Sequence, residues 1–461
     1  MEELKIVLTN EMLSKAFDFN LPRSILYIDR SNVGLEKERM HNLIGFAQRE
    51  PLVKDLLIYL ASKGFYLIEA SQGVSKFEKF INAESFKHNV KVKNLQIYKE
   101  LYYTLDEPLL NFGKNRLIVL FSSVADFAFN ADISRRNFFT NFSTISKYIP
   151  QNTYVLRIGD IGGVLGNFYM NTTYSNKIEE GVQDLIQFIL HSNNIEKSDV
   201  VLYGASKGGT ATLYHGILGG YKSIAVDPIV SDTYHEENSF DSHFTQPRKV
   251  SRLYPQSKQE KFSNFIKGRE IPDNITILYS QNSPIYDAIN SIVRDNDKEN
   301  KINYLNVCHP EIKTHPDVAP KTINILMLVL NNFFYNLGKI QSKNIDCNDV
   351  TKIEKKEVVG ALKLTKLILE KKSKDINNSY LRAYDKNLQN YQDYPLTKTI
   401  TEISLFKLKG KHLSIVELDA TTVSNEYSIS ISLEKSSILS KLASLTNIEK
   451  EGINFLFLSI S

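Results

Sequence analysis

The chain has 461 residues, more than one ordinary core can organise, so two or three domains are expected. Its 42% hydrophobic and 23% charged content is typical of a globular protein rather than a disordered one, and a net charge of +4 gives no support to nucleic-acid binding. Two cysteines, Cys308 and Cys347, are too few for a disulfide framework or a metal cluster, so we expect a reducing cytoplasm and no metal.

No secretory or membrane-spanning segment is expected. Acidic and amide side chains recur through residues 1–20, which excludes the apolar core of a secretory signal. The longest apolar run, 325–330, is far shorter than the roughly 20 residues of a membrane helix. Any contact with a membrane would therefore be peripheral.

Residues 1–105 are predicted to form a small α/β region. Strand-like runs at 24–28 and 66–68 flank residues 51–65, whose apolar positions recur at helical spacing. Residues 77–103 are lysine-rich and amphipathic, which is typical of a solvated helical face; a binding surface is the alternative. No group of chemically reactive residues gathers in this region.

Residues 106–340 are predicted to form the main domain, because strands and helices alternate there. Apolar runs typical of buried strands occupy 116–121, 153–158, 200–203, 223–229, 274–280 and 302–307, and helical patterns occupy 178–189, the segment after 206, and 322–337. This alternation predicts a mostly parallel sheet with helices on both faces.

The centre of this domain is the sequence Gly204-Ala205-Ser206-Lys207-Gly208, between a strand and a helix. This is the context of a nucleophile elbow, in which flanking glycines permit a strained turn that exposes a serine. Ser206 is the predicted nucleophile, and the N–H of Lys207, at the start of the helix, is a predicted oxyanion donor. A glycine-rich turn that only binds an anion or packs is the alternative.

Two earlier loops follow predicted strands at the same edge. Ser122 and Ser123 come directly after the strand 116–121, where such folds place a second oxyanion N–H; a simple polar turn is equally compatible. Asp160 follows the strand 153–158. It could bind a substrate hydroxyl, although a role in its own loop is favoured because aspartate commonly stabilises turns.

The general base and its acid are expected after later strands, in the order serine, acid, histidine. For the base we favour His315 over His309, which follows its strand almost at once. For the acid we favour Asp287 over Asp227, because the proline after Asp227 indicates a structural turn. Asp317 lies so close to His315 that it is expected to serve its own loop.

The polar and aromatic segment 232–252 contains His235 and His243. Its spacing matches no strong metal-binding pattern, so a lid or substrate loop over the site is favoured over a metal site.

The stretch 203–214, with Ser-Lys-Gly-Gly at the elbow, resembles the XcbB/CpsF family of bacterial capsular polysaccharide biosynthesis proteins. It is also similar, more distantly, to α/β-hydrolase-type acetyltransferases of capsule O-acetylation. The resemblance covers about residues 110–340, and Ser206, Asp287 and His315 match the family's nucleophile, acid and base by motif and order. The loop 280–283 departs from many hydrolases, since it has no early acidic residue.

The resemblance implies an α/β-hydrolase-like fold and a capsule pathway, with a cytoplasmic location that could be peripheral at the inner membrane. It further implies a polysaccharide or glycan precursor as acceptor, acetyl-coenzyme A as acyl donor with no bound cofactor, and other capsule biosynthesis proteins as partners.

Residues 341–461 lie outside the resemblance. Residues 344–374 are lysine-rich and predicted to be helical, and alternation such as that at 427–433 predicts half-buried strands. A β-rich appendage that completes the fold is favoured; binding of a glycan or a partner is the alternative.

The predicted activity is transfer or hydrolysis of an acyl group. Ser206 attacks the donor, His315 carries the proton, and the N–H groups of Lys207 and Ser123 hold the oxyanion. A non-catalytic assembly protein of the capsule machinery is the alternative. A glycosyl- or phosphoglycosyltransferase is disfavoured, because neither a nucleotide-phosphate loop nor paired metal-binding acids occur.

Overall fold

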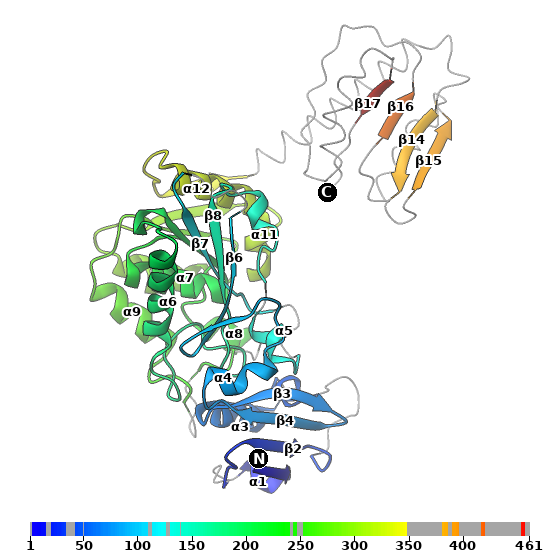
Figure 1. Ribbon diagram of the computed structural model, residues 1–461, viewed down its shortest axis with the longest axis vertical. Helices are drawn as coiled ribbons and strands as arrows, with labels where there is room; N and C mark the ends of the chain where they lie inside the picture. The colour runs from blue at the N-terminus through cyan, green and yellow to red at the C-terminus, as the bar shows by residue number, and fades with distance from the viewer. Residues whose placement is uncertain are drawn as a thin grey trace. The chain divides into compact units, whose positions relative to one another are not determined.

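The computed structural model describes residues 2–14, 20–33, 42–48, 50–108, 113–125, 130–138, 140–239, 243–246 and 252–347, together with four strands beyond them (Figure 1). The chain divides into two compact units, 1–347 and 348–461. Each unit is described by itself.

A nine-stranded sheet organises the first unit. Its strands are β5 (Gln96–Tyr98), β6 (Leu101–Asp106), β7 (Arg116–Phe121), β8 (Thr153–Ile158), β9 (Val200–Ala205), β10 (Lys222–Val226), β11 (Ile275–Tyr279), β12 (Asn303–Cys308) and β13 (Lys343–Asp346). They lie in the order β13-β12-β11-β10-β9-β7-β8-β6-β5. In this order every neighbouring pair from β13 across to β8, β7 included, is parallel. The strand β6 runs antiparallel to both of its neighbours, β8 and β5.

Helices cover both faces of this sheet, as its apolar strands require (Figure 1). Alternate residues of β7 enter different cores: Leu117 and Val119 pack with α6 (Ile178–Ser192), whereas Ile118 packs with α12 (Ile323–Tyr335). The helix α7 (Lys207–Gly219) directly follows the central strand β9. The predicted α/β-hydrolase-like sheet, mostly parallel and with helices on both faces, is confirmed.

Shorter helices fill the connections of this unit. They are α4 (Ala83–Phe86), η1 (Lys87–Asn89), α5 (Ile133–Asn137), η2 (Ile145–Lys147), η3 (Lys197–Asp199), α8 (Thr233–Ser239), α9 (Lys258–Lys267), α10 (Tyr286–Ile292), η4 (Arg294–Asn296), η5 (His315–Asp317) and α11 (Val318–Lys321). Of these, α8 and η5 border the candidate site.

A second, four-stranded sheet occupies the N-terminal region. Its elements are β1 (Glu3–Val7), α1 (Asn10–Ser14), β2 (Ile25–Asp29), α2 (Leu43–Ala47), α3 (Pro51–Ser62), β3 (Phe65–Ser71) and β4 (Val74–Lys79), with strand order β1-β2-β4-β3. The buried guanidinium of Arg136 links this sheet to the loop after β8, since it donates to the carbonyls of Leu67 (2.8 Å) and Val164 (2.9 Å). Burial lowers the pKa of Arg136 to about 9.

The lysine-rich segment 77–103 exposes Lys87, Lys91, Lys93 and Lys99, as expected of a solvated face, but it is not one continuous helix. This segment forms the end of β4, then α4, η1, β5 and most of β6, and it buries Phe86 and Tyr102 completely on its other side. Because β5 and β6 belong to the nine-stranded sheet, that sheet begins before the expected boundary at residue 105.

In the second unit the structure describes the backbone of four antiparallel strands. These are β14 (Tyr380–Asp385), β15 (Asn390–Pro395), β16 (Val416–Asp419) and β17 (Ile453–Leu456), in the order β15-β14-β16-β17. They agree with a β-rich C-terminal region. Residues 344–346, at the start of the segment predicted to be helical, belong to β13 instead. Residues 348–374 and the predicted strand at 427–433 lie outside the described residues.

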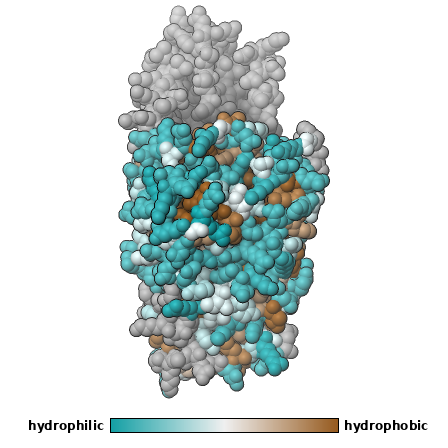
Figure 2. All heavy atoms as spheres, turned by 90° about the vertical axis from the view of Figure 1, so that its left-hand side faces the viewer, coloured by the Kyte–Doolittle hydropathy of each residue, from teal (hydrophilic) through white to brown (hydrophobic). Residues whose placement is uncertain are grey.

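The face shown in Figure 2 is mainly hydrophilic, with small separate hydrophobic areas. Among the residues that the structure describes, none of the helices combines the length and the apolar character needed to cross a membrane.

Candidate active site

Ser206 occupies a strained turn between β9 and α7, as the elbow motif predicts. Its backbone has φ 58° and ψ −120°, and its N–H donates to the carbonyl of Val226 at 2.9 Å. The flanking glycines are required by close backbone contact: a Cβ on Gly204 would lie 2.3 Å from the oxygen of Gly208, and a Cβ on Gly208 would lie 2.3 Å from that of Phe121. Such strain persists because the surrounding backbone enforces it.

The side chain of Ser206 lies at one end of a hydrogen-bonded relay. The Nε2 atom of His315 is 2.8 Å from Ser206 Oγ, and its Nδ1 atom is 2.7 Å from Asp227 Oδ2. An ionised carboxylate accepts only, so Nδ1 carries the proton and the neutral ring accepts the serine hydroxyl at Nε2. This is the arrangement of nucleophile, base and orienting acid.

The acid of this relay is Asp227 and not Asp287, so the favoured prediction for the acid is wrong. Asp287 is an exposed residue in the first turn of α10. Asp227 directly follows β10, the neighbour of β9, and its left-handed backbone, φ 44°, is one that aspartate tolerates. The turn indicated by Pro228 exists, and it is this turn that carries the acid.

The loop after β11 contributes Ser283, which the sequence analysis did not identify. Its hydroxyl donates to Asp227 Oδ2 at 2.6 Å, and Asp227 is 1% exposed. A hydrogen bond to the charged form of a buried carboxylate stabilises that form. A serine in a polar turn carries no pattern that would reveal this role.

His315 begins η5, and a local capping box fixes the start of that turn. Asp317 Oδ2 accepts from the N–H and the hydroxyl of Thr314, both at 2.7 Å, and the hydroxyl bond lowers the pKa of Asp317. The expected local role of Asp317 is confirmed. The alternative base, His309, accepts the N–H of Glu311 at Nδ1 (3.1 Å), within its own loop.

The predicted oxyanion donors of the loop after β7 have protein acceptors. The N–H of Ser122 donates to the hydroxyl of Tyr169 at 2.7 Å, and the N–H of Ser123 donates to Asn141 Oδ1 at 3.2 Å. The simple structural turn is therefore the better interpretation of both serines. The N–H of Lys207 lies in the first turn of α7, where N–H groups lack intrahelical acceptors, and it stays the predicted donor.

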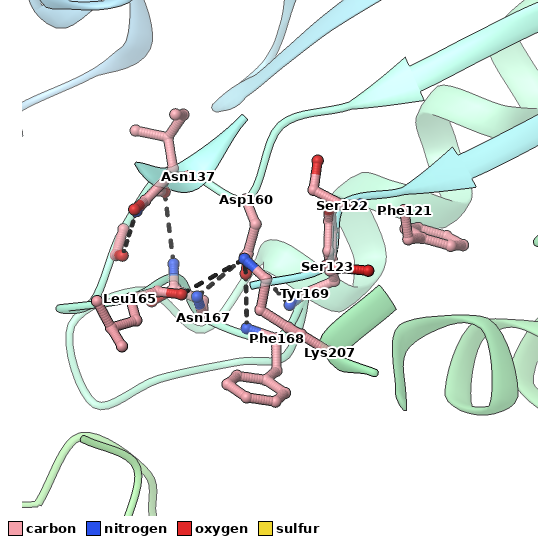
Figure 3. A network of polar contacts seen from close by, with 12 residues as sticks. Phe121, Ser122, Ser123, Asn137, Asp160, Leu165, Asn167, Phe168, Tyr169 and Lys207 are labelled. Carbon is pink, nitrogen blue, oxygen red and sulfur yellow. Dashed lines mark hydrogen bonds and ion pairs between the residues drawn. The ribbon is translucent and has the colours of Figure 1, made fainter. Parts of the chain in front are cut away.

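Asp160 is the centre of a buried polar network (Figure 3). Its carboxylate accepts from the N–H groups of Asn167 (2.9 Å), Phe168 (2.9 Å) and Tyr169 (3.2 Å) and from Lys207 Nζ (2.9 Å). Phe168 and Tyr169 both have left-handed backbones, which turn their N–H groups toward one anion. Because these four donors surround a carboxylate that is 3% exposed, the substrate-hydroxyl interpretation of Asp160 is wrong and the structural one holds.

The network connects the elbow to the loop after β7. Tyr169 supplies one of the N–H groups bound by Asp160, and its hydroxyl donates to the carbonyl of Ile158 at 2.8 Å while it accepts the N–H of Ser122. Burial raises the pKa of Tyr169, so its hydroxyl stays protonated. The side chain of Lys207 belongs to the site as well as its N–H, and the sign of this in the sequence is a lysine between the small residues of the elbow.

The segment predicted as a lid contributes α8, which borders the relay. The ring centroid of His235 is 5.6 Å from that of His315, with an interplanar angle of 78°. Within the described residues no cluster of three histidine, cysteine or acidic side chains could hold a metal ion.

The nine-stranded sheet and the serine elbow define an α/β-hydrolase-like protein with a Ser-His-Asp relay. No protein-family model matches the chain, and no curated protein matches it. Among solved structures, the chain is similar to a glycosylation-associated protein complex of Streptococcus agalactiae, with 17% identity, 59% of this chain and 53% of that one covered, and a TM-score of 0.41. The chain therefore spans about half the length of that structure.

Two further structures of this kind cover more of their own length. A fluorophosphonate-binding serine hydrolase of Staphylococcus aureus has 13% identity, coverage of 52% of this chain and 94% of that one, and a TM-score of 0.32. A capsule O-acetyltransferase of Neisseria meningitidis serogroup A has 15% identity, coverage of 56% and 90%, and a TM-score of 0.30.

Proposed function

We propose that this chain is a serine-dependent acyltransferase or esterase. The observation that carries the proposal is the relay itself: Ser206, His315 and Asp227 are joined by hydrogen bonds of 2.8 and 2.7 Å, at a strained elbow next to a helix N-terminus. A merely structural serine needs neither a strained backbone nor a histidine oriented by a buried carboxylate.

In the first half-reaction Ser206 Oγ bonds to the acyl carbon of the donor while its proton passes to His315 Nε2. The carbonyl oxygen becomes an oxyanion, which the N–H of Lys207 stabilises. Asp227 stabilises the imidazolium and keeps Nδ1 protonated. The bond between the acyl carbon and its leaving group then breaks, and the departing group takes the proton from His315.

In the second half-reaction an acceptor hydroxyl attacks the acyl-serine. Its proton passes to His315, the ester bond to Ser206 breaks, and the proton returns to Ser206 Oγ. A sugar hydroxyl as acceptor gives transfer, and water gives hydrolysis, so the two activities share all of these residues and differ in whether the closed site excludes water.

The acceptor is proposed to be a polysaccharide or its precursor, and the donor acetyl-coenzyme A. These assignments, together with a capsule pathway, a cytoplasmic or peripheral inner-membrane location and other capsule proteins as partners, rest on the resemblance of residues 203–214 to the XcbB/CpsF family.

The test is labelling with a fluorophosphonate probe, followed by intact mass. We expect one adduct on the wild-type chain and none on Ser206→Ala. Asp227→Asn should reduce the labelling rate about 10⁴-fold, as loss of the orienting acid does in such triads, whereas the matched change Asp287→Asn should leave it unchanged. A folded wild-type chain that takes no label would contradict the proposal and favour a non-catalytic assembly role.

A further inference from the structure

The helix α8 is fixed against the main domain by a buried anchor at its start. Asp232 Oδ1 accepts from Lys258 Nζ at 2.6 Å, and Oδ2 accepts from the hydroxyl of Thr245 at 2.6 Å. Burial alone would raise the pKa of Asp232, but Lys258 and His243 outweigh it and lower the pKa to about 2. Because a buried charge must be paired, this anchor holds α8 in one place.

The N-terminal region supplies a second anchor for the same helix. Lys54, in α3, is 1% exposed, and its Nζ atom lies 2.9 Å from Glu236 Oε2 in α8. The same ammonium lies 5.7 Å from the ring centre of Phe244. A lysine of the small sheet region therefore contacts the segment that borders the active site.

His235, one residue before Glu236, brings this helix to the base. Its ring packs edge to face on His315, as given above, and on His243 at 4.7 Å and 67°. Burial, followed by the neighbouring His243, His315 and Lys258, lowers the pKa of His235 to about 3, with Asp232 acting in the opposite direction. The ring of His235 is thus neutral near pH 7. It therefore adds no charge beside the imidazolium that forms on His315.

His315 needs such a neighbour. Its two hydrogen bonds, to Asp227 and Ser206, are made at the edge of the ring by its two nitrogen atoms, so the faces of the ring are held by packing alone. The residue begins a one-turn helix, and its side chain is only 10% exposed. The ring of His235, packed at 78° to that of His315, opposes movement of the His315 ring out of its plane.

We propose that His235 is a positioning residue for His315 and that the N-terminal region holds it in place through the contact of Lys54 with Glu236. The inference rests on the proposed function, since it makes His315 the base. It gives the N-terminal region a task in the reaction, which the sequence of that region did not indicate.

The first experiment measures the second-order rate of fluorophosphonate labelling on the full chain. We expect His235→Ala to lower this rate roughly 2- to 12-fold, the range for loss of one aromatic pair, and His235→Phe, which keeps a ring, to retain it within about twofold. Glu237→Gln, on the exposed side of α8, is the matched control and should have no effect. Equal rates for His235→Ala and wild type, or equal losses for His235→Ala and His235→Phe, would overturn the proposal.

A second readout does not depend on activity. The proton that His315 Nδ1 donates to Asp227 should give a low-field NMR signal, which Asp227→Ala abolishes. We expect this signal to be sharp in the wild-type chain and in His235→Phe, and broadened by exchange with water in His235→Ala. If the wild-type chain takes no label but the signal follows this pattern, the proposed function fails and the positioning role stands. An unchanged signal in His235→Ala would contradict the positioning role.

The contribution of the N-terminal region is tested with the double variant Lys54→Met/Glu236→Gln, which removes both charges together. Its labelling rate should fall in the same way as that of His235→Ala. Addition of His235→Ala should then cause little further loss, because both changes act through α8. Losses that multiply would show that Lys54 does not act through His235.

Discussion

The buried ion pair of Lys207 and Asp160 has a large predicted effect on stability. Lys207→Met keeps most of the length and apolar contact of the side chain and removes its ammonium group. The carboxylate of Asp160 then keeps its three backbone N–H donors but loses its only cationic partner among the hydrogen bonds described above. The change therefore tests how much of the network depends on charge.

The magnitude follows from burial. The two side chains are 0% and 2% exposed, so solvent does not screen the pair. Breaking a buried pair on one side costs about 3–5 kcal/mol, and the remaining N–H bonds place this case near the lower limit, about 3 kcal/mol. For a large unit each 1 kcal/mol lowers the Tm by about 2 °C, so the expected shift is roughly 6 °C.

The assay is thermal unfolding followed by circular dichroism, with a double-mutant cycle that includes Asp160→Asn. We expect Lys207→Met to be much less destabilising in the Asp160→Asn background, because the orphaned charge is then absent. Lys99→Met, which removes an exposed ion pair with Asp184, is the control and should leave the Tm unchanged. Equal Tm values for Lys207→Met and Lys99→Met would refute this reasoning.

Two further predictions concern Ser283 and His215. Ser283→Ala removes a charge-assisted hydrogen bond to Asp227 and should slow fluorophosphonate labelling roughly tenfold, whereas Ser291→Ala, in α10, should not. Burial lowers the pKa of His215 from its usual 6.5 to about 4. Between pH 6.5 and pH 4, His215 is therefore protonated in the unfolded chain and neutral in the folded chain. The contribution of His215 to the free energy of unfolding should thus fall by about 3 kcal/mol as the pH drops from 6.5 to 4, and the contribution of His235, whose pKa is lowered as well, should fall in the same direction. His215→Gln should remove the part that His215 contributes, about 3 kcal/mol, whereas exposed His191→Gln should leave the pH dependence unchanged; urea titrations at each pH measure both.

The elbow could be predicted from sequence because the residues that it requires, two glycines around a serine between a strand and a helix, are adjacent in the chain. Gly204 and Gly208 face backbone atoms of neighbouring segments at distances that exclude any side chain, and the apolar run before Ser206 has the length of one buried strand. The main sheet was predictable for a similar reason: strands buried on both faces are continuous apolar runs.

The acid could not be chosen from sequence because loop order fixes the edge of the sheet and not the direction of a side chain. Asp227 and Asp287 both follow strands that end at the same edge. Two features of the folded chain distinguish them: the backbone of Asp227 is left-handed, and Ser283, from the next loop, donates a hydrogen bond to its carboxylate. Neither leaves a pattern in the chain. In the segment 77–103 the lysines indicated the exposed side correctly, whereas the aromatic residues that it buries showed no regular spacing from which the short strands and helices could be predicted.

Several parts of the candidate site are held in place by buried carboxylates, and this explains why they were difficult to predict. Asp160, Asp227 and Asp232 are each at most 3% exposed, and each is bound by donors from segments distant in sequence. A buried carboxylate is stable only when its donors are in place, so each loop is restricted to the conformation that supplies them. The three carboxylates therefore position the elbow, the base and α8 through contacts that only the folded chain brings together.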